Sequence, residues 1–143
     1  MKTTLTQEVQ EIMNKRFGKD TLIALATTQN ATPYVRAVNT YYENGCFYVI
    51  THALSNKMQQ IGENPTIAIC GDWFTAHGVG ENMGHILAKE NEEIAAKLRK
   101  AFCEWYDNGH SDENDPNTVI LRVRLTDGVL FSHGTRYDID FTA

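Results

Sequence analysis

Apolar residues recur at helical spacing in two stretches of the chain. In the first stretch they are Leu5, Val9, Ile12, Met13 and Phe17. Gly18 follows as a stop signal, and we expect the helix to begin with a capping box formed by Thr4 and Gln7. In the second stretch the apolar stripe consists of Ile94, Leu98, Ala101, Phe102 and Trp105. This stripe predicts a second helix over Asn91–Tyr106.

Elsewhere the pattern changes to short apolar or alternating runs, which are typical of strands. The predicted strands are Thr21–Thr28, Pro33–Tyr42, Cys46–Thr51, Thr66–Gly71, Val119–Leu125, Val129–His133 and Tyr137–Phe141. Turns are expected at Gln29-Asn30-Ala31, Asn44-Gly45 and Asp127-Gly128. Short antiparallel strands with a few helices predict an α+β protein, mainly β, that folds as a small closed or partly open barrel.

Three glycines, Gly78, Gly80 and Gly84, lie in the least legible segment, Trp73–Leu87. A nucleotide-binding glycine loop requires a helix directly afterwards, and no helical pattern follows Gly84. We therefore expect these glycines to mark bulges or close backbone contacts within strands. The polar connection Asp107–Asn117 lacks the alternating acids of a calcium loop, and we expect it to be solvated.

A short helix after the strand Cys46–Thr51 carries an unusual charge. Ser55 is its predicted N-cap, and Met58 and Ile61 form its inward face. The first turn holds Lys57 and no acid, although a cation there is disfavoured by roughly 0.3–1 kcal/mol. A phosphate bound between this helix end, Lys57 and the Ser55 hydroxyl explains the placement. The alternative is a solvated lysine tolerated on a surface turn.

Arg36 is the second candidate for anion binding. It lies in the strand Pro33–Tyr42 on the same face as Tyr34, Val38 and Thr40. A guanidinium between such neighbours is unfavourable unless it meets an anion or a carboxylate. Its planar fork suits phosphate oxygens, and Lys57 supplies a compact second charge. Two cations and a hydroxyl at a helix N-terminus predict a site for a phosphate monoester.

Composition limits the classes of partner. The chain has 143 residues, 42% of them apolar, and a formal net charge of −5, so we expect a single domain spanning residues 1–143. The only basic cluster is Lys97–Lys100, which argues against nucleic acid or an anionic membrane surface as partner. No signal peptide or bilayer-spanning stretch is evident, and we expect a cytoplasmic protein. We expect Cys46, Cys70 and Cys103 to be buried thiols of a reducing compartment, without a metal.

Several short motifs, taken in order, resemble one known family. They are Arg36-Ala37-Val38, Tyr48-Val49-Ile50-Thr51, Ser55-Asn56-Lys57, Asn64-Pro65 and Trp73. Their order and spacing resemble the FMN-binding split-barrel proteins of the pyridoxamine 5′-phosphate oxidase superfamily. The resemblance extends from about Leu5 to Phe141. It implies a six-stranded antiparallel split β-barrel that forms a homodimer, with FMN at the subunit interface.

The resemblance also implies the roles of individual residues. Arg36 and Lys57 would bind the FMN phosphate with help from Ser55. The backbone of Arg36, Ala37, Val38 and Asn39, and that of Ile50 and Thr51, would follow the ribityl chain and the flavin edge. Side chains of Asn39 and Thr40 are further candidates for cofactor contact, and His52 and His77 are candidates for contact with flavin or substrate. No catalytic residue is predicted, since a flavin itself carries the hydride.

Two departures separate this chain from the vitamin B6 oxidases. The substrate-binding lysine of those enzymes is replaced by Tyr41, and their C-terminal arginine and tryptophan pattern by the segment Gly134–Phe141. The chain is more similar to the general-stress-protein-like branch. The resemblance thus implies a flavin-dependent oxidoreductase that moves hydride or electrons between NADH or NADPH and a small acceptor.

Three other interpretations of the sequence stay open. One is a flavin-binding protein without turnover, acting as a sensor, chaperone or store. Another is the same barrel holding a deazaflavin or a haem, for which His77 or His133 would be the axial ligand. The third is a β-rich interaction domain without a cofactor.

Overall fold

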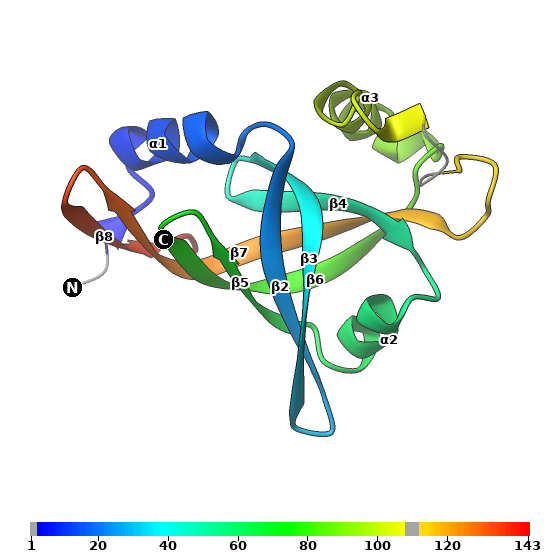
Figure 1. The fold of residues 1–143 in the computed structure, drawn as a ribbon, viewed down its shortest axis with the longest axis horizontal. Helices are drawn as coiled ribbons and strands as arrows, with labels where there is room; N and C mark the ends of the chain where they lie inside the picture. The colour runs from blue at the N-terminus through cyan, green and yellow to red at the C-terminus, as the bar shows by residue number, and fades with distance from the viewer. Residues whose placement is uncertain (1–2, 108–111) are drawn as a thin grey trace.

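A ring of six strands forms the body of the computed structural model, which describes residues 3–107 and 112–143. The described residues form eight strands in all: β1 (Thr3–Thr4), β2 (Thr21–Gln29), β3 (Thr32–Glu43), β4 (Cys46–His52), β5 (Thr66–Gly71), β6 (Phe74–His85), β7 (Thr118–Ser132) and β8 (Thr135–Asp140). The ring runs β7-β4-β3-β2-β5-β6 and closes through antiparallel pairing of β6 with β7 (Figure 1). The predicted six-stranded barrel is confirmed. Strand β8 extends the sheet outside the ring along the second half of β7, and β1 lies parallel to β8.

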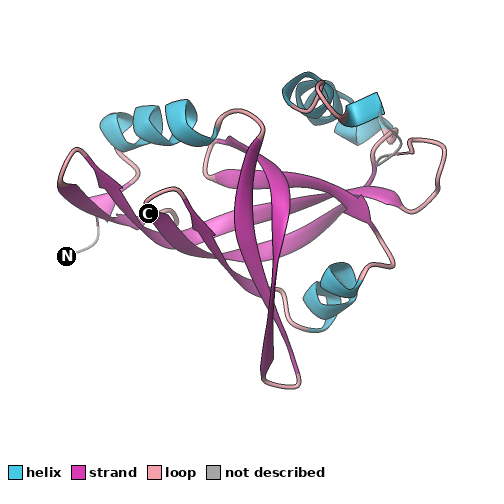
Figure 2. Ribbon diagram, in the orientation of Figure 1, coloured by secondary structure: helices cyan, strands magenta, loops and turns pink. Residues whose placement is uncertain are grey.

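Helices sit around the outside of this ring (Figure 2). They are α1 (Gln7–Phe17), α2 (Asn56–Glu63) and α3 (Glu92–Ala101), and a 3₁₀ turn at Lys89–Asn91 precedes α3. Helix α1 lies near β8, whereas α2 lies at the opposite end of the barrel (Figure 1). No helix among residues 3–107 and 112–143 is long and apolar enough to cross a lipid bilayer.

Strand alternation divides the apolar residues between two clusters. In β7, Val119, Leu121, Val123 and Leu125 point into the barrel. Ile120 points outward and joins Leu98 and Phe102 in a second cluster beneath α3. Inside the barrel the rings of Phe17, Phe47 and Phe74 contact one another. The centroid of the Phe17 ring lies 5.5 Å from the ring centroids of the other two. Both clusters follow from the pattern of apolar positions in the sequence.

The N-terminal and C-terminal ends of the predicted helices need correction. Thr6, rather than Thr4, caps α1, because its hydroxyl accepts a hydrogen bond from the N–H of Val9 at 3.3 Å. Helix α3 ends at Ala101, five residues earlier than expected. Phe102 and Tyr106 are nevertheless buried in the second cluster. Their apolar spacing therefore marks packing that continues beyond α3, through turns at residues 102–105 and a π-helical turn at Tyr106.

The predicted hairpin at Asp127-Gly128 is wrong, because β7 continues through both residues to Ser132. A Cβ atom at Gly128 would lie 3.0 Å from the Phe74 ring, so this glycine permits close strand contact rather than a turn. The turn lies instead at His133-Gly134, both with positive φ (50° and 79°). The expectation for the Trp73–Leu87 segment is confirmed at Gly78, where a Cβ would lie 2.9 Å from the Arg124 carbonyl oxygen.

The cysteines are more accessible than expected. Cys70 and Cys103 are exposed and Cys46 is half-buried, and all three are free thiols. Cys70 lies on the outward side of β5, since its neighbours Ile67 and Ile69 take the inward positions. In the polar connection Asp107–Asn117, positions 108–111 lie outside the described residues.

Candidate functional site

Strands β3 and β4 separate at one end of the barrel. They pair only through three residues on each strand, from Tyr41↔Tyr48 to Glu43↔Cys46. Residues 32–40 of β3 pair only with β2, and residues 49–52 of β4 pair only with β7. An extended strand directs its N–H and C=O groups to both sides. Among the described strands, none pairs with the edges that face this gap, which we call the β3–β4 split.

Helix α2 begins directly after β4, at the β3–β4 split. Ser55 is its N-cap, and the Ser55 hydroxyl accepts a hydrogen bond from the N–H of Met58 at 3.4 Å. Met58 and Ile61 are buried, and the first turn contains no acidic residue. The helix predicted from the sequence, its cap and its inward face are confirmed.

Arg36 reaches from β3 toward α2 and is held only by neutral acceptors. Its Nη1 donates to Thr27 Oγ1 at 2.8 Å and to the Leu25 carbonyl at 3.3 Å, and its Nη2 donates to Gln60 Oε1 at 3.0 Å. Within the described part of the chain, no carboxylate forms an ion pair with this guanidinium. Burial lowers its pKa from the ordinary value. The sequence predicts either an anion or a carboxylate as the partner of Arg36. Among residues 3–107 and 112–143, no carboxylate takes that role.

Lys57 lies close to Arg36. Its ammonium donates to the Thr51 hydroxyl at the end of β4 and to Ser55 Oγ at 3.4 Å. Burial lowers the pKa of Lys57, and the positive charge of Arg36 lowers it further. The fold thus brings Arg36, Thr51, Ser55 and Lys57 together, as the sequence predicted. Two cations converge with hydroxyl groups and a helix N-terminus.

Other predicted site residues use their side chains elsewhere. Val38 points into the core, and Thr40 donates to the Thr21 carbonyl at 2.9 Å. Ile50 packs against the cluster beneath α3, and Ala37 is exposed. For Val38, Thr40 and Ile50, only the backbone is available toward the β3–β4 split.

Asn39 is engaged in a bridge between β3 and the segment after α3. Its amide donates to Asp20 Oδ1 at 3.0 Å, while the indole N–H of Trp105 donates to Asp20 Oδ2 at 2.9 Å. The two candidate histidines also have carboxylate neighbours. His52 Nε2 lies 3.3 Å from Asp115 Oδ2, and His77 Nδ1 lies 3.0 Å from Asp127 Oδ1.

Two residues of this site, Thr27 and Gln60, are not predicted by the sequence pattern. Both are almost fully buried, with 1% and 4% of their surface exposed. Thr27 Oγ1 donates to Gln60 Oε1 at 2.5 Å, and both contact Arg36. A signal was present, because Gln60 directly precedes Ile61 on the inward side of α2. Its acceptor role is set by tertiary contacts that spacing does not reveal.

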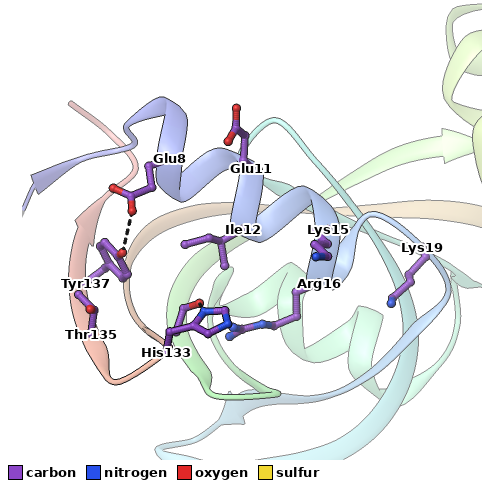
Figure 3. A pocket seen from close by; sticks show the side chains of 10 residues that line it. Glu8, Glu11, Ile12, Lys15, Arg16, Lys19, His133, Thr135 and Tyr137 are labelled. Atoms are coloured by element: carbon purple, nitrogen blue, oxygen red, sulfur yellow. Dashed lines mark hydrogen bonds between the residues drawn. The ribbon is translucent and has the colours of Figure 1, made fainter.

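A separate hollow of about 680 Å³ lies between α1 and the β7–β8 hairpin (Figure 3). Glu8 accepts a hydrogen bond from the Tyr137 hydroxyl there at 3.1 Å. Lys15, Lys19 and His133 also line it, whereas Arg16 donates to the carbonyls of Asp72 and Phe131. Of the residues predicted to contact FMN, none lines this hollow, whereas His133, the alternative haem ligand, does.

The closed ring and its split define a split-barrel protein. The family model described as pyridoxamine 5′-phosphate oxidase matches residues 5–130, so the chain belongs to this family. No curated protein matches the sequence.

Solved structures share the fold at low sequence identity. General Stress Protein 26 from Bacillus anthracis is 17% identical with a TM-score of 0.64, and the match covers 85% of this chain and 92% of that one. A FAD-binding protein from Mesorhizobium loti is 14% identical with a TM-score of 0.66, covering 88% and 94%. A heme binding protein from Mycobacterium smegmatis is 14% identical with a TM-score of 0.63, covering 85% and 53%.

The lowered pKa of Lys57 predicts a pH-dependent stability. The folded pKa lies below the ordinary value of 10.5, so the unfolded chain binds this proton more tightly. The contribution of Lys57 to the free energy of unfolding is therefore lowest below the folded pKa and rises toward pH 10.5. We expect the unfolding free energy of Lys57→Met, minus that of wild type, to fall as the pH rises through this window.

Urea unfolding near pH 7 and near pH 10, in buffer without phosphate, measures this difference. Lys15→Met is the control, since Lys15 lies in the last turn of α1, where a cation is favourable. A difference for Lys57→Met that stays constant with pH would contradict the prediction.

Proposed function

We propose that this protein binds FMN through Arg36 and Lys57 and acts as a flavin-dependent oxidoreductase. The electron donor in this proposal is NADH or NADPH, and the acceptor is a small molecule. The supporting observation is the convergence of two cations on the N-terminus of α2 without an acidic partner among the described residues.

A phosphate monoester matches the charge of this site. Such a group carries about −1.5 to −2 charges at neutral pH, which balances one guanidinium and one ammonium. Its oxygens accept hydrogen bonds from the Arg36 fork, from Lys57 and from free N–H groups of the first turn of α2. A bound anion also offsets the repulsion from Arg36, which adds to burial in lowering the pKa of Lys57.

The β3–β4 split gives the remainder of FMN a backbone surface. Within the described residues, the edges at residues 32–40 and 49–52 pair with no strand on the side of the split. Their N–H and C=O groups can hydrogen-bond a ribityl chain and the polar edge of an isoalloxazine ring. When bound, the flavin supplies the hydride chemistry, while this chain holds and orients it. A FAD-binding protein and a heme binding protein share this fold, which supports a planar cofactor in this proposal.

Pyridoxamine phosphate is not the proposed substrate. Tyr41 occupies the position of the substrate-binding lysine, and its hydroxyl hydrogen-bonds Glu43 at 3.5 Å. Arg136, in the segment that replaces the C-terminal pattern, forms an ion pair with Asp138 at 2.9 Å. Neither position offers a free cation to a second phosphate.

A homodimer belongs to the same proposal. The outer face of β2 and β3 carries no helix in front of it (Figure 1) and exposes Leu22 and Val35, at 63% and 71%. Between them lie small residues, including the register pair Ala24↔Ala37 directly beside Arg36. A second copy on this face would bury the apolar surface and enclose the cofactor.

The free thiols suit a reducing compartment, and we propose a cytoplasmic location.

Removing both cations tests the cofactor site. The double variant Arg36→Ala/Lys57→Ala loses two charge-assisted contacts, each worth about 1.5–3 kcal/mol. We expect its FMN affinity to fall by more than about a hundredfold, with its thermal unfolding temperature unchanged or higher. Flavin fluorescence titration and the visible spectrum of the purified protein measure this. Lys15→Ala/Lys19→Ala removes the same charge elsewhere and should retain FMN, while retention of FMN by the first variant would refute the site.

Turnover separates an enzyme from a binding protein. We expect the FMN-loaded protein to oxidise NADH or NADPH in the presence of oxygen or a quinone acceptor, measured as loss of absorbance of the reduced nicotinamide. Absence of turnover with both donors and every acceptor would favour the sensor or store. A haem-type absorption band in the purified protein would show that the cofactor is haem and not FMN.

A charge on the outer face tests the dimer. Val35→Asp should convert a species with twice the mass of the chain into a monomer and weaken FMN binding, because a carboxylate is unfavourable in an apolar interface. Sedimentation equilibrium and flavin titration provide the two measurements. Thr75→Asp, at an exposed position on β6, is the control. A wild-type monomer that binds FMN normally would exclude this interface.

A further inference from the structure

Gln60 holds the phosphate-binding arginine in place without neutralising it. We propose that Gln60, together with Thr27, is a positioning residue that grips one end of the Arg36 guanidinium and leaves its other edge for two phosphate oxygens. The inference rests on the proposed function for the identity of the ligand. It rests on the contacts of three side chains for its geometry.

The hydrogen bonds that Arg36 donates to Thr27 and Gln60, which we call the grip, involve both terminal nitrogens of Arg36. Nη1 donates to Thr27 Oγ1 at 2.8 Å and Nη2 donates to Gln60 Oε1 at 3.0 Å. These two acceptors are only 2.5 Å apart, since Thr27 Oγ1 donates to Gln60 Oε1. Two acceptors so close together, each on a different terminal nitrogen, must lie side by side at the end of the guanidinium. The Leu25 carbonyl takes a further Nη1 hydrogen at 3.3 Å.

This arrangement leaves one edge of Arg36 available. A guanidinium has five N–H donors, and the three contacts use both hydrogens of Nη1 and one of Nη2. The remaining donors are Nε–H and the second Nη2–H, which point in the same direction. For Nε, no partner exists among the described residues. Two parallel N–H groups are the pair that binds carboxylate or phosphate oxygens bidentately.

The grip is rigid because its acceptors are buried. Thr27 belongs to β2 and Gln60 to α2, and 1% and 4% of their surfaces are exposed. Their mutual hydrogen bond joins the strand to the helix that also carries Lys57. Arg36 is therefore fixed relative to Lys57 before any ligand arrives, which reduces the entropy lost on binding.

Because Thr27 and Gln60 are neutral, they leave the positive charge of Arg36 available to an anion. A glutamate at position 60 would orient Arg36 with the same geometry, but its carboxylate would form a buried ion pair with the guanidinium. The ligand would then compete with an internal anion. An amide oxygen orients the guanidinium and leaves its full charge for a phosphate.

The decisive variant is Gln60→Glu, compared with Gln59→Glu. Gln59 precedes it on the same helix, is exposed and undergoes the same change of charge. We expect Gln60→Glu to weaken FMN binding by about tenfold or more and to leave riboflavin, which lacks the phosphate, within about twofold of wild type. Gln59→Glu should bind both ligands like wild type. Flavin fluorescence titration at two salt concentrations should also give a flatter salt dependence for Gln60→Glu.

Two results would overturn the inference. One is a Gln60→Glu protein that binds FMN like wild type. The other is a folded Gln60→Glu protein that loses riboflavin and FMN to the same extent, since that result assigns Gln60 a general structural role. If Gln60→Glu does not fold, Gln60→Leu replaces it. This variant removes the acceptor without adding charge and should weaken FMN severalfold and riboflavin not at all; an equal loss of both would likewise overturn the inference.

Inorganic phosphate distinguishes failure of the grip from failure of the proposed cofactor. Phosphate should raise the thermal unfolding temperature of wild type and of Gln59→Glu by mass action, and have little effect on Gln60→Glu. If wild type responds to phosphate but not to FMN, the cofactor assignment fails and the grip stands. If wild type responds to neither, or if Gln60→Glu responds to phosphate like wild type, the grip is refuted.

Discussion

The sheet closes into a ring because β6 pairs with β5 on one side and with β7 on the other. Six strands enclose a space filled by the rings of Phe17, Phe47 and Phe74, and the closing pair must approach closely enough to complete its hydrogen bonds. Glycines at the contact, including Gly78 and Gly128, permit that approach. β6 and β7 pair from Phe74↔Leu130 to His85↔Val119 with two register shifts, whereas β3 and β4 separate beyond Tyr41↔Tyr48. The backbone groups that the ring leaves unpaired there form one wall of the candidate site. The same six-stranded ring therefore contains both the closing strand pair and the unpaired strand edges of the candidate site.

The candidate site favours binding over stability. Two cations share a partly buried position, and each is held by neutral oxygens where a carboxylate would stabilise the isolated chain more. Such an arrangement is typical of functional sites, because a charge satisfied internally is not available to a ligand. The same principle applies to the outer face of β2 and β3, where Leu22 and Val35 remain exposed. Both regions are unfavourable in an isolated chain, and the proposed anion and the proposed second copy would each offset that cost.

Local patterns predicted much of this molecule. Strand β5 has the predicted bounds, the Asn44-Gly45 turn joins β3 to β4, and α2 has its cap and inward face as expected. Each of these depends on neighbouring residues, and so does the placement of Lys57 in an acid-free first turn. The failures depend on distant residues. Asp127-Gly128 has the composition of a turn, yet strands on both sides of β7 hold it extended. The role of Gln60 is equally hidden, since it is defined by a strand 33 positions away.

The Asp20 bridge gives the molecule a built-in optical probe. One carboxylate oxygen holds Asn39 on β3 and the other holds the indole N–H of Trp105, whose ring stacks on Phe102. Asp20 therefore connects the position of Asn39 on β3 to the environment of this indole. The second tryptophan, Trp73, is largely exposed at the β5–β6 turn, so its emission is expected at longer wavelength. Intrinsic fluorescence can therefore follow ligand-linked motion of β3 in an unlabelled protein, with the two emitters separated by colour.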